Sequence, residues 1–285
     1  MKKRFCFAKS RLFLLLLAVL TSAMQSCSQN TADRDDWYEL SWYDEFNGKT
    51  INDSIWSKMK RIHGVNCVCN LTSDGRMYDV RKGRLRLYAR YNDGLLPNDT
   101  ARFLTGGVTS EGKRTFTYGK IEVRVRLHGA VGTWPAIWTM PDDRKYWKCP
   151  NPKYTEIDIL EYVNRNDEVY QTAHNAYTLA DRKNRSNPRQ AHAAPVKAER
   201  YNIYSVEILP DVLIYSINGE ETFRYPRVKE HKDQFPYGIE SHIMMDMQVY
   251  PPDFWSRGVQ PETFPAYMDI DWIRVYKLKQ PEKTR

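Results

Sequence analysis

The sequence lacks the features that would place it in several common protein classes. Its 285 residues show no sustained helical periodicity, no internal repeat and no low-complexity segment. The longest apolar run, LFLLLLAVL, has nine residues, too few for a helix that spans a bilayer. Cysteine is scarce, and the Cys-x-Cys pair at 67 and 69 has no second Cys or His cluster that would complete a zinc site.

Positive charge is unevenly distributed along the chain. The formal net charge is +8, but no acidic residue precedes Asp33, and subtracting the five basic residues in that stretch leaves about +3 for the remainder. Such a balance is ordinary, so the sequence does not favour a nucleic-acid-binding protein. The five residues are Lys2, Lys3, Arg4, Lys9 and Arg11.

The N-terminal segment resembles a bacterial lipoprotein signal. A basic stretch, the apolar run and MQSC end at Cys27, although Met24 stands where Leu is usual. This predicts a signal over residues 1–27 with lipidation at Cys27, a polar tether over 28–36 and a folded domain over 37–279. The chain would be exported and anchored to the outer membrane, at the cell surface or in the periplasm. The alternative is an ordinary secretory peptide with an incidental Cys27.

Export permits a disulfide among the three cysteines beyond the anchor. Either Cys149 pairs with Cys67 or Cys69, or all three are free thiols. The spacing does not decide between these alternatives.

Short segments with period-two alternation predict an all-β domain. In GKIEVRVRL the apolar and charged residues alternate, and Asn218-Gly219 after an apolar run predicts a tight hairpin turn. Such strands over about 240 residues favour a two-sheet antiparallel sandwich. The predicted strands cover residues 84–91, 119–127, 201–209, 212–217 and 267–277.

The segment YTEIDILEYV places three carboxylates in an otherwise apolar strand. On a regular strand Glu156 and Asp158 would share one face and Glu161 would point away. One extra residue, as in a β-bulge, would return Glu161 to the shared face. Converging side chains would then approach the 5–5.5 Å separation of carboxyl groups in a retaining glycosidase. A solvated acidic strand edge or a calcium site are the alternatives.

The same segment resembles a known family. EIDILE matches the E-x-D-x-x-E signature of family 16 glycoside hydrolases, in the bulged subgroup of laminarinases, agarases, porphyranases and mucin-glycan hydrolases. LSWYDEFNG, TFTYGKIEVRVRL, GTWPAIWTM and YMDIDWIRVYK resemble further family segments in the same order. The resemblance implies a jelly-roll sandwich with a concave substrate cleft and a retaining, endo-acting mechanism. It also implies Glu156 as nucleophile, Asp158 as assisting acid and Glu161 as general acid/base.

The resemblance extends to residues that would bind substrate. Trp134 and Trp138 lie four apart and are expected on one strand face, where indoles stack on sugar rings. His174 is expected beside the acids, and Gln248 and Trp255 are expected to contact sugar or wall a subsite. Core packing of the two tryptophans and a structural His174 are the competing interpretations.

One residue matches a metal position of the family. Asp271 in the closing strand, with backbone near Glu45 and Gly83, resembles a structural calcium position of many relatives. The alternative is a surface Asp. No cofactor is required for the expected reaction, and a monomer is expected.

Two departures from the glucanase pattern bear on substrate. Thr155 stands where laminarinases usually carry Gly, and VYPPDFW replaces a Gly-Gly-x-Trp run. These changes favour a galactose-containing β-glycan, and an endo-β-1,3(4)-glucanase is the alternative. A non-catalytic carbohydrate-binding lipoprotein would not need all three acids. A transglycosylase would share every residue named.

Overall fold

The computed structural model of the chain describes residues 35–61, 70–250 and 258–279. Residues 40–278 form one compact unit. Asp35–Glu39 and Lys279 belong to a second unit, in which the 3-10 helix η1 (Asp35–Trp37) lies and the Lys279 N–H donates to the Trp37 carbonyl at 2.8 Å. The predicted signal, Cys27 and most of the tether lie outside the described residues. Within the described part, no helix is both long and apolar enough to cross a bilayer.

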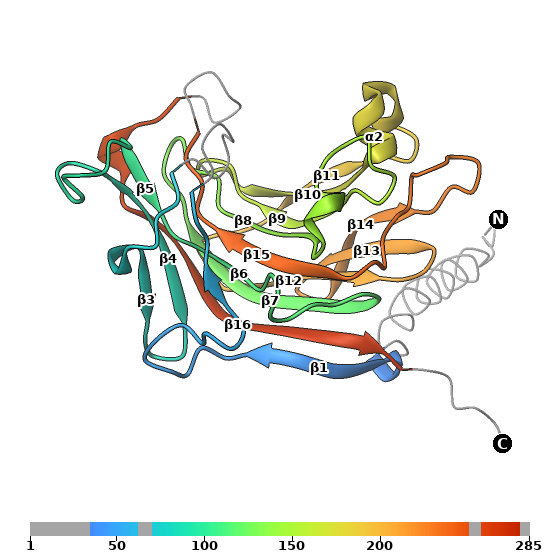
Figure 1. Cartoon of the computed structure of the whole chain (residues 1–285), viewed down its shortest axis with the longest axis horizontal. Helices are drawn as coiled ribbons and strands as arrows, with labels where there is room; N and C mark the ends of the chain where they lie inside the picture. The colour runs from blue at the N-terminus through green and yellow to red at the C-terminus, as the bar shows by residue number, and fades with distance from the viewer. Residues whose placement is uncertain (1–34, 62–69, 251–257, 280–285) are drawn as a thin grey trace, which may run out of the picture. The chain divides into compact units, whose positions relative to one another are not determined.

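The larger unit consists of two antiparallel sheets, which Figure 1 shows as two layers. One sheet has nine described strands, in the order β14 (Glu220–Pro226), β13 (Val212–Ile217), β12 (Asn202–Ile208), β7 (Gly119–His128), β16 (Ala266–Leu278), β4 (Leu85–Tyr91) and β3 (Tyr78–Val80), with β1 (Tyr38–Asp44) paired to β16 and β5 (Phe103–Thr105) paired to β4. The other has seven, in the order β11 (Ala191–Pro195), β10 (Glu168–Asn175), β9 (Thr155–Glu161), β8 (Ala136–Pro141), β15 (Ser241–Asp246), β6 (Gly107–Thr109) and β2 (Ser57–Lys58). The predicted all-β sandwich is confirmed.

Within the described residues of the larger unit, helical structure is confined to short segments between strands. The α-helix α2 (Ala176–Ala180) follows β10 directly, and Asn175 caps it by accepting from the Thr178 N–H. The 3-10 helices are η3 (Gly75–Met77), η4 (Arg144–Tyr146), η5 (Arg182–Arg185) and η6 (Pro261–Thr263).

Alternation of side chains builds the core between the two sheets. Along β7 every second residue is buried, with Val123 and Val125 facing inward while Glu122 and Arg124 face outward. Apolar side chains of β9, such as Leu160, enter the same core cluster. Burial of these side chains supplies the main driving force that holds the sheets together. All five predicted strands form, with ends that differ by one residue or less.

The hairpin between β13 and β14 turns where the sequence predicts it. Asn218 has φ of 54° and Gly219 has φ of 84°. Positive φ at both central residues is characteristic of a type I′ turn, whose backbone twist matches that of the two antiparallel strands. Asn and Gly tolerate this conformation best, so these two residues determine the register of the hairpin.

Candidate active site

A β-bulge in β9 brings the three acids onto one face. On β10, Thr172 lies opposite Asp158 and Tyr170 lies opposite Glu161. Two residues of β10 therefore span three residues of β9, and the pairing with β8 shifts at the same place. One extra residue reverses the alternation once, as predicted. The bulge between Asp158 and Glu161 is confirmed.

The acids lie on the outer face of the seven-stranded sheet, here called the acid-bearing face. Ile157 and Leu160 point the other way, into the core between the sheets. Asp158 is 3% exposed and Glu161 is 8% exposed, whereas Glu156 is half-buried. Glu156 therefore has more access to water than the other two acids, and such a difference shifts the pKa values of carboxyl groups apart.

Glu161 is the acid that is held protonated at neutral pH. Its burial, together with the charge of Glu156, raises its pKa to about 8. The hydrogen bond from Thr172 and the nearby Trp134 side chain favour the ionised form and offset part of this shift. The Thr172 Oγ1 donates to Glu161 Oε2 at 3.2 Å. Glu161 can therefore supply a proton at pH 7 and regain it later.

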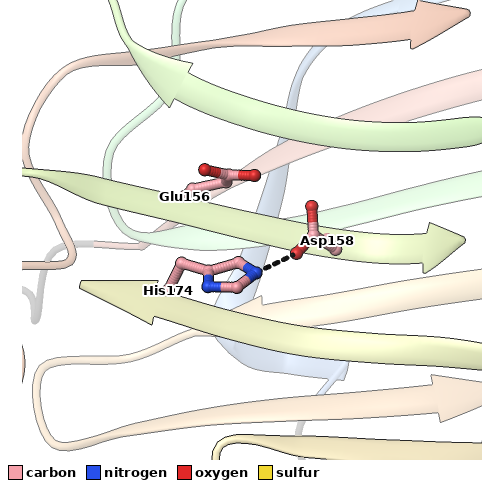
Figure 2. A group of neighbouring side chains, drawn as sticks. All are labelled: Glu156, Asp158 and His174. Carbon is pink, nitrogen blue, oxygen red and sulfur yellow. Dashed lines mark ion pairs between the residues drawn. The ribbon is translucent and has the colours of Figure 1, made fainter. Parts of the chain in front are cut away.

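Asp158 is placed between the other two acids and pairs with His174. Figure 2 shows the His174 ring directed at the Asp158 carboxyl. His174 lies on the neighbouring strand β10, and its Nε2 is 3.4 Å from Oδ2 of Asp158. Burial and the charges of Glu161 and Glu156 raise the pKa of Asp158 well above its ordinary value. Burial also lowers the pKa of His174. The pair therefore favours a neutral imidazole beside a protonated carboxyl at neutral pH.

Gln190 orients the His174 ring from its far side. The Gln190 Nε2 lies 2.7 Å from Nδ1 of His174, and Gln190 itself is 4% exposed. With the amide assigned in this orientation, Nδ1 accepts and Nε2 carries the hydrogen toward Asp158. The predicted position of His174 beside the acids is therefore found, and Gln190 is an additional member of the site that sequence reasoning missed.

Tyr154 contacts the first acid of the motif. Its hydroxyl donates to Oε2 of Glu156, and the side chain is 9% exposed. Burial, followed by the charge of Glu156, raises the pKa of Tyr154 far above its ordinary value. The hydroxyl therefore keeps its proton over the whole working range. Period-two spacing from Glu156 was the sequence signal for this contact, because residues two apart on a strand share a face.

The two tryptophans occupy different structural positions. Trp138 lies in β8 opposite Asp158, and its indole N–H donates to Oδ1 of Asp246 at 2.9 Å. Trp134 precedes β8, so the expectation that both belong to one strand run is wrong. Its backbone N–H donates to the carbonyl of Gln248 at 2.8 Å. Trp134 nevertheless lies near Glu161, whose pKa its side chain lowers, and its ring stacks on Tyr250 with the ring centroids 4.3 Å apart.

Asp246 is a buried carboxyl that no sequence pattern had indicated. It is fully buried in β15, and burial raises its pKa to about 7 against the opposing hydrogen bonds of Trp138 and Gln248. Gln248 was expected to bind sugar, and here it is 4% exposed and lies near Asp246, whose pKa it lowers. These contacts link β8 and β15 beside the acids.

Several predicted residues lie outside this cluster. Trp255 falls outside the described residues, as do Cys67 and Cys69. Cys149 is an exposed free thiol in the segment between β8 and β9. The disulfide alternative is therefore not supported at Cys149.

The calcium position expected at Asp271 stays a prediction. The Asp271 carboxylate is ion-paired with Arg124, and the Glu45 side chain accepts from Arg274 at 2.8 Å. A calcium ion, which takes six to eight oxygen ligands, would have to displace Arg124 from the Asp271 carboxylate. The described residues contain one group of three potential metal donors, which is Glu156, Asp158 and His174 of the acid cluster.

Comparison with known proteins agrees with this geometry. The model of glycosyl hydrolases family 16 matches residues 68–274, more than half of the chain. The chain is 30% identical over 274 residues to a β-glucanase from Rhodothermus marinus, across 91% of this chain and 93% of that protein. It is 30% identical over 244 residues to a keratan-sulfate endo-1,4-β-galactosidase from Sphingobacterium multivorum, across 85% of this chain and 56% of that protein.

A solved structure supports the same assignment. It belongs to work on the endo-acting O-glycanases that prominent members of the human gut microbiota express to initiate mucin breakdown. It superposes with a TM-score of 0.70 at 25% identity, across 85% of this chain and 100% of that chain.

The β-sandwich and the bulged acidic strand define a glycoside-cleaving enzyme. The chain belongs to glycosyl hydrolases family 16. It is an endo-acting O-glycosyl hydrolase of polysaccharides, and retention of anomeric configuration is general to this family.

Proposed function

We propose that Glu156 is the nucleophile of a retaining β-glycanase and that Glu161 is its general acid/base. In the first half-reaction a Glu156 oxygen bonds to the anomeric carbon while the bond to the leaving oxygen breaks. The Glu161 proton passes to that oxygen. In the second half-reaction water attacks the anomeric carbon, its proton passes to Glu161, and the Glu156 carboxylate is released.

The observation that carries this proposal is the contrast between two acids on one strand face. Glu161 is buried and its pKa is raised to about 8, partly by the charge of Glu156. Glu156 is more exposed and accepts a hydrogen bond from Tyr154. Glu161 is thus held as an acid beside a more exposed carboxyl group, which fits the division of roles that retaining hydrolysis needs.

Asp158 has an assisting role in this proposal. Its protonated carboxyl lies between the two glutamates in sequence, and its pairing with His174 holds it in place. A neutral Asp158 does not add a third negative charge to the site, so Glu156 alone carries the charge that attacks the sugar.

The proposed substrate is a galactose-containing β-glycan. Support comes from the likeness to the keratan-sulfate endo-1,4-β-galactosidase and to the O-glycanase structure. Thr155, which is buried beside Glu156, and VYPPDFW at 249–255 also depart from the laminarinase pattern. An axial hydroxyl needs a matching polar partner, and a site built for one rejects the equatorial isomer strongly.

An endo-β-1,3(4)-glucanase is the second candidate. The β-glucanase from Rhodothermus marinus has the same 30% identity and is matched over a larger share of its own length. This observation favours a glucan, whereas the residues around the motif favour a galactan.

A side-by-side assay on polysaccharides distinguishes the two substrates. The domain spanning residues 28–285 is incubated with laminarin, mixed-linkage glucan, an algal galactan and a mucin-type glycan, with Glu156→Gln as the inactive control. We expect the higher kcat/KM on a galactose-containing glycan. A tenfold preference for laminarin, about 1.4 kcal/mol in the transition state, would replace the galactan proposal with the glucanase one. Sizing the products separates hydrolysis from transglycosylation.

We propose that a lipid anchor at Cys27 attaches the chain to a membrane, with residues 28–36 as a tether. Two acyl signals or a diacylglyceryl group would hold the catalytic domain at a membrane surface. Metabolic labelling with a fatty acid should mark the wild-type chain and leave Cys27→Ser unlabelled. Equal labelling of both chains would contradict the anchor.

A further inference from the structure

Tyr154 is held rigidly beside Glu156 by apolar packing. It lies one residue before β9, and its ring belongs to a small buried cluster on the acid-bearing face. With the side chain 9% exposed and in contact on several sides, the ring has little freedom to turn away. The other buried members of this cluster are Met59, Leu71, Met140 and Met244.

The hydroxyl of this fixed ring has one acidic partner. It donates to Oε2 of Glu156, a contact between residues two apart on one strand face. A hydrogen bond from a neutral donor to a carboxylate favours the ionised carboxylate. It also engages one of the two carboxylate oxygens and leaves Oε1 available.

We infer that Tyr154 is a positioning residue that stabilises the Glu156 carboxylate through this hydrogen bond and directs its Oε1 at the anomeric carbon. This inference rests on the proposed role of Glu156 as nucleophile. The tyrosine O–H bond is not broken in either half-reaction. In the first, the hydroxyl fixes the carboxylate plane. In the second, the same hydrogen bond receives the negative charge that returns to Glu156 as its bond to the sugar breaks.

Other ionisable groups also face Glu156, and they differ from Tyr154 in kind. Asp158 and Glu161 share its strand and have raised pKa values, so they are protonated where the acidic limb of the rate profile falls. His174 faces it from β10, and Cys149 lies in the β8–β9 connection. Among the described groups, Tyr154 is the neutral donor that hydrogen-bonds the Glu156 carboxylate.

Tyr154→Phe tests this inference because it removes the hydroxyl and keeps the ring in its apolar cluster. The acidic limb of kcat/KM against pH should move upward by about one unit, because Glu156 is protonated more readily without its donor. At the pH optimum kcat should fall about tenfold with KM changed less than twofold. If Tyr154 only fills space in the apolar cluster, Tyr154→Phe should change neither the acidic limb of the pH profile nor kcat.

Tyr276→Phe is the matched control. Tyr276 also contacts a carboxylate, Glu122, but on the outer face of the nine-stranded sheet. It should leave the pH profile unchanged. A similar shift in this control would overturn the inference, since the effect would then be general to tyrosine loss.

A second variant covers the case in which Tyr154→Phe does not fold. A fluorinated tyrosine at position 154 keeps the packing and is a stronger donor, so the acidic limb should move to lower pH. Movement in the opposite direction, or none, would overturn the inference. If Glu156→Gln retains activity, the proposed nucleophile itself fails. If Glu156→Gln is inactive and both Tyr154 variants match wild type, the Tyr154 inference alone fails.

Discussion

Replacing Thr172 with Val should move the basic limb of the kcat/KM profile to higher pH. Thr172 donates to Glu161 Oε2, and this hydrogen bond favours the ionised carboxylate. Without it, the pKa of Glu161 rises above its present value of about 8. The general acid then keeps its proton to a higher pH, so activity declines later as the pH increases.

The size of the shift follows from the geometry of this contact. The distance of 3.2 Å is slightly longer than the usual range for a hydroxyl donor. Such a hydrogen bond contributes about 1 kcal/mol. At 1.36 kcal/mol per pKa unit, the limb should move upward by about 0.7 unit. Val matches Thr in shape, and Thr172 is 6% exposed, so the strand should keep its packing.

The assay is initial-rate kinetics at low substrate concentration between pH 4 and 10. Thr222→Val is the control, because Thr222 donates to the neutral side chain of Gln171 at 2.6 Å and does not contact Glu161. The control should leave the basic limb in place. A Thr172→Val limb that stays fixed or moves to lower pH would refute the assignment of this limb to Glu161.

Two further predictions concern the glutamates. Glu156→Gln should reduce hydrolysis below roughly 1% of wild type with the fold intact, because the amide is not a nucleophile; higher residual activity in a purified, contamination-free sample would contradict the assignment. Glu161→Gln should raise the melting temperature relative to wild type at pH 8 and not at pH 4. The pKa of Glu161 is about 8 in the folded state and 4.5 ordinarily, so the unfolded chain loses this proton at a lower pH than the folded protein does. The wild-type protein therefore loses stability as the pH rises from 4.5 to about 8, by an upper bound of roughly 5 kcal/mol. An equal offset at both pH values in thermal unfolding would argue against this linkage.

Much of the fold could be predicted because its signals are local. Alternation in Ile121–Arg126 follows from the two-residue period of a strand, and Asn218-Gly219 follows from the φ values that a type I′ turn requires. The acidic triplet was also readable, since three carboxylates within six residues of an apolar strand need one bulge to share a face.

The contacts around the acids that join distant segments could not be predicted from any one strand. Gln190 precedes β11 and reaches His174 on β10, while Asp246 on β15 receives the indole N–H of Trp138. Trp134 lies outside the strand in which it was expected, because β8 begins only at Ala136. A pattern within one strand carries no information on which side chain a neighbouring strand places beside it.

The sequence by itself determined the strand alternation, the hairpin turn and the set of three acids, because each depends on residues within a few positions of one another. Only the tertiary structure decided which acid keeps its proton. That difference arises from burial and from neighbours across strands, since Glu161 lies away from water beside Thr172 while Glu156 is more exposed beside Tyr154. Desolvation and charge pairing depend on three-dimensional position, so the division of the two glutamates into acid and nucleophile is a property of the folded sheet.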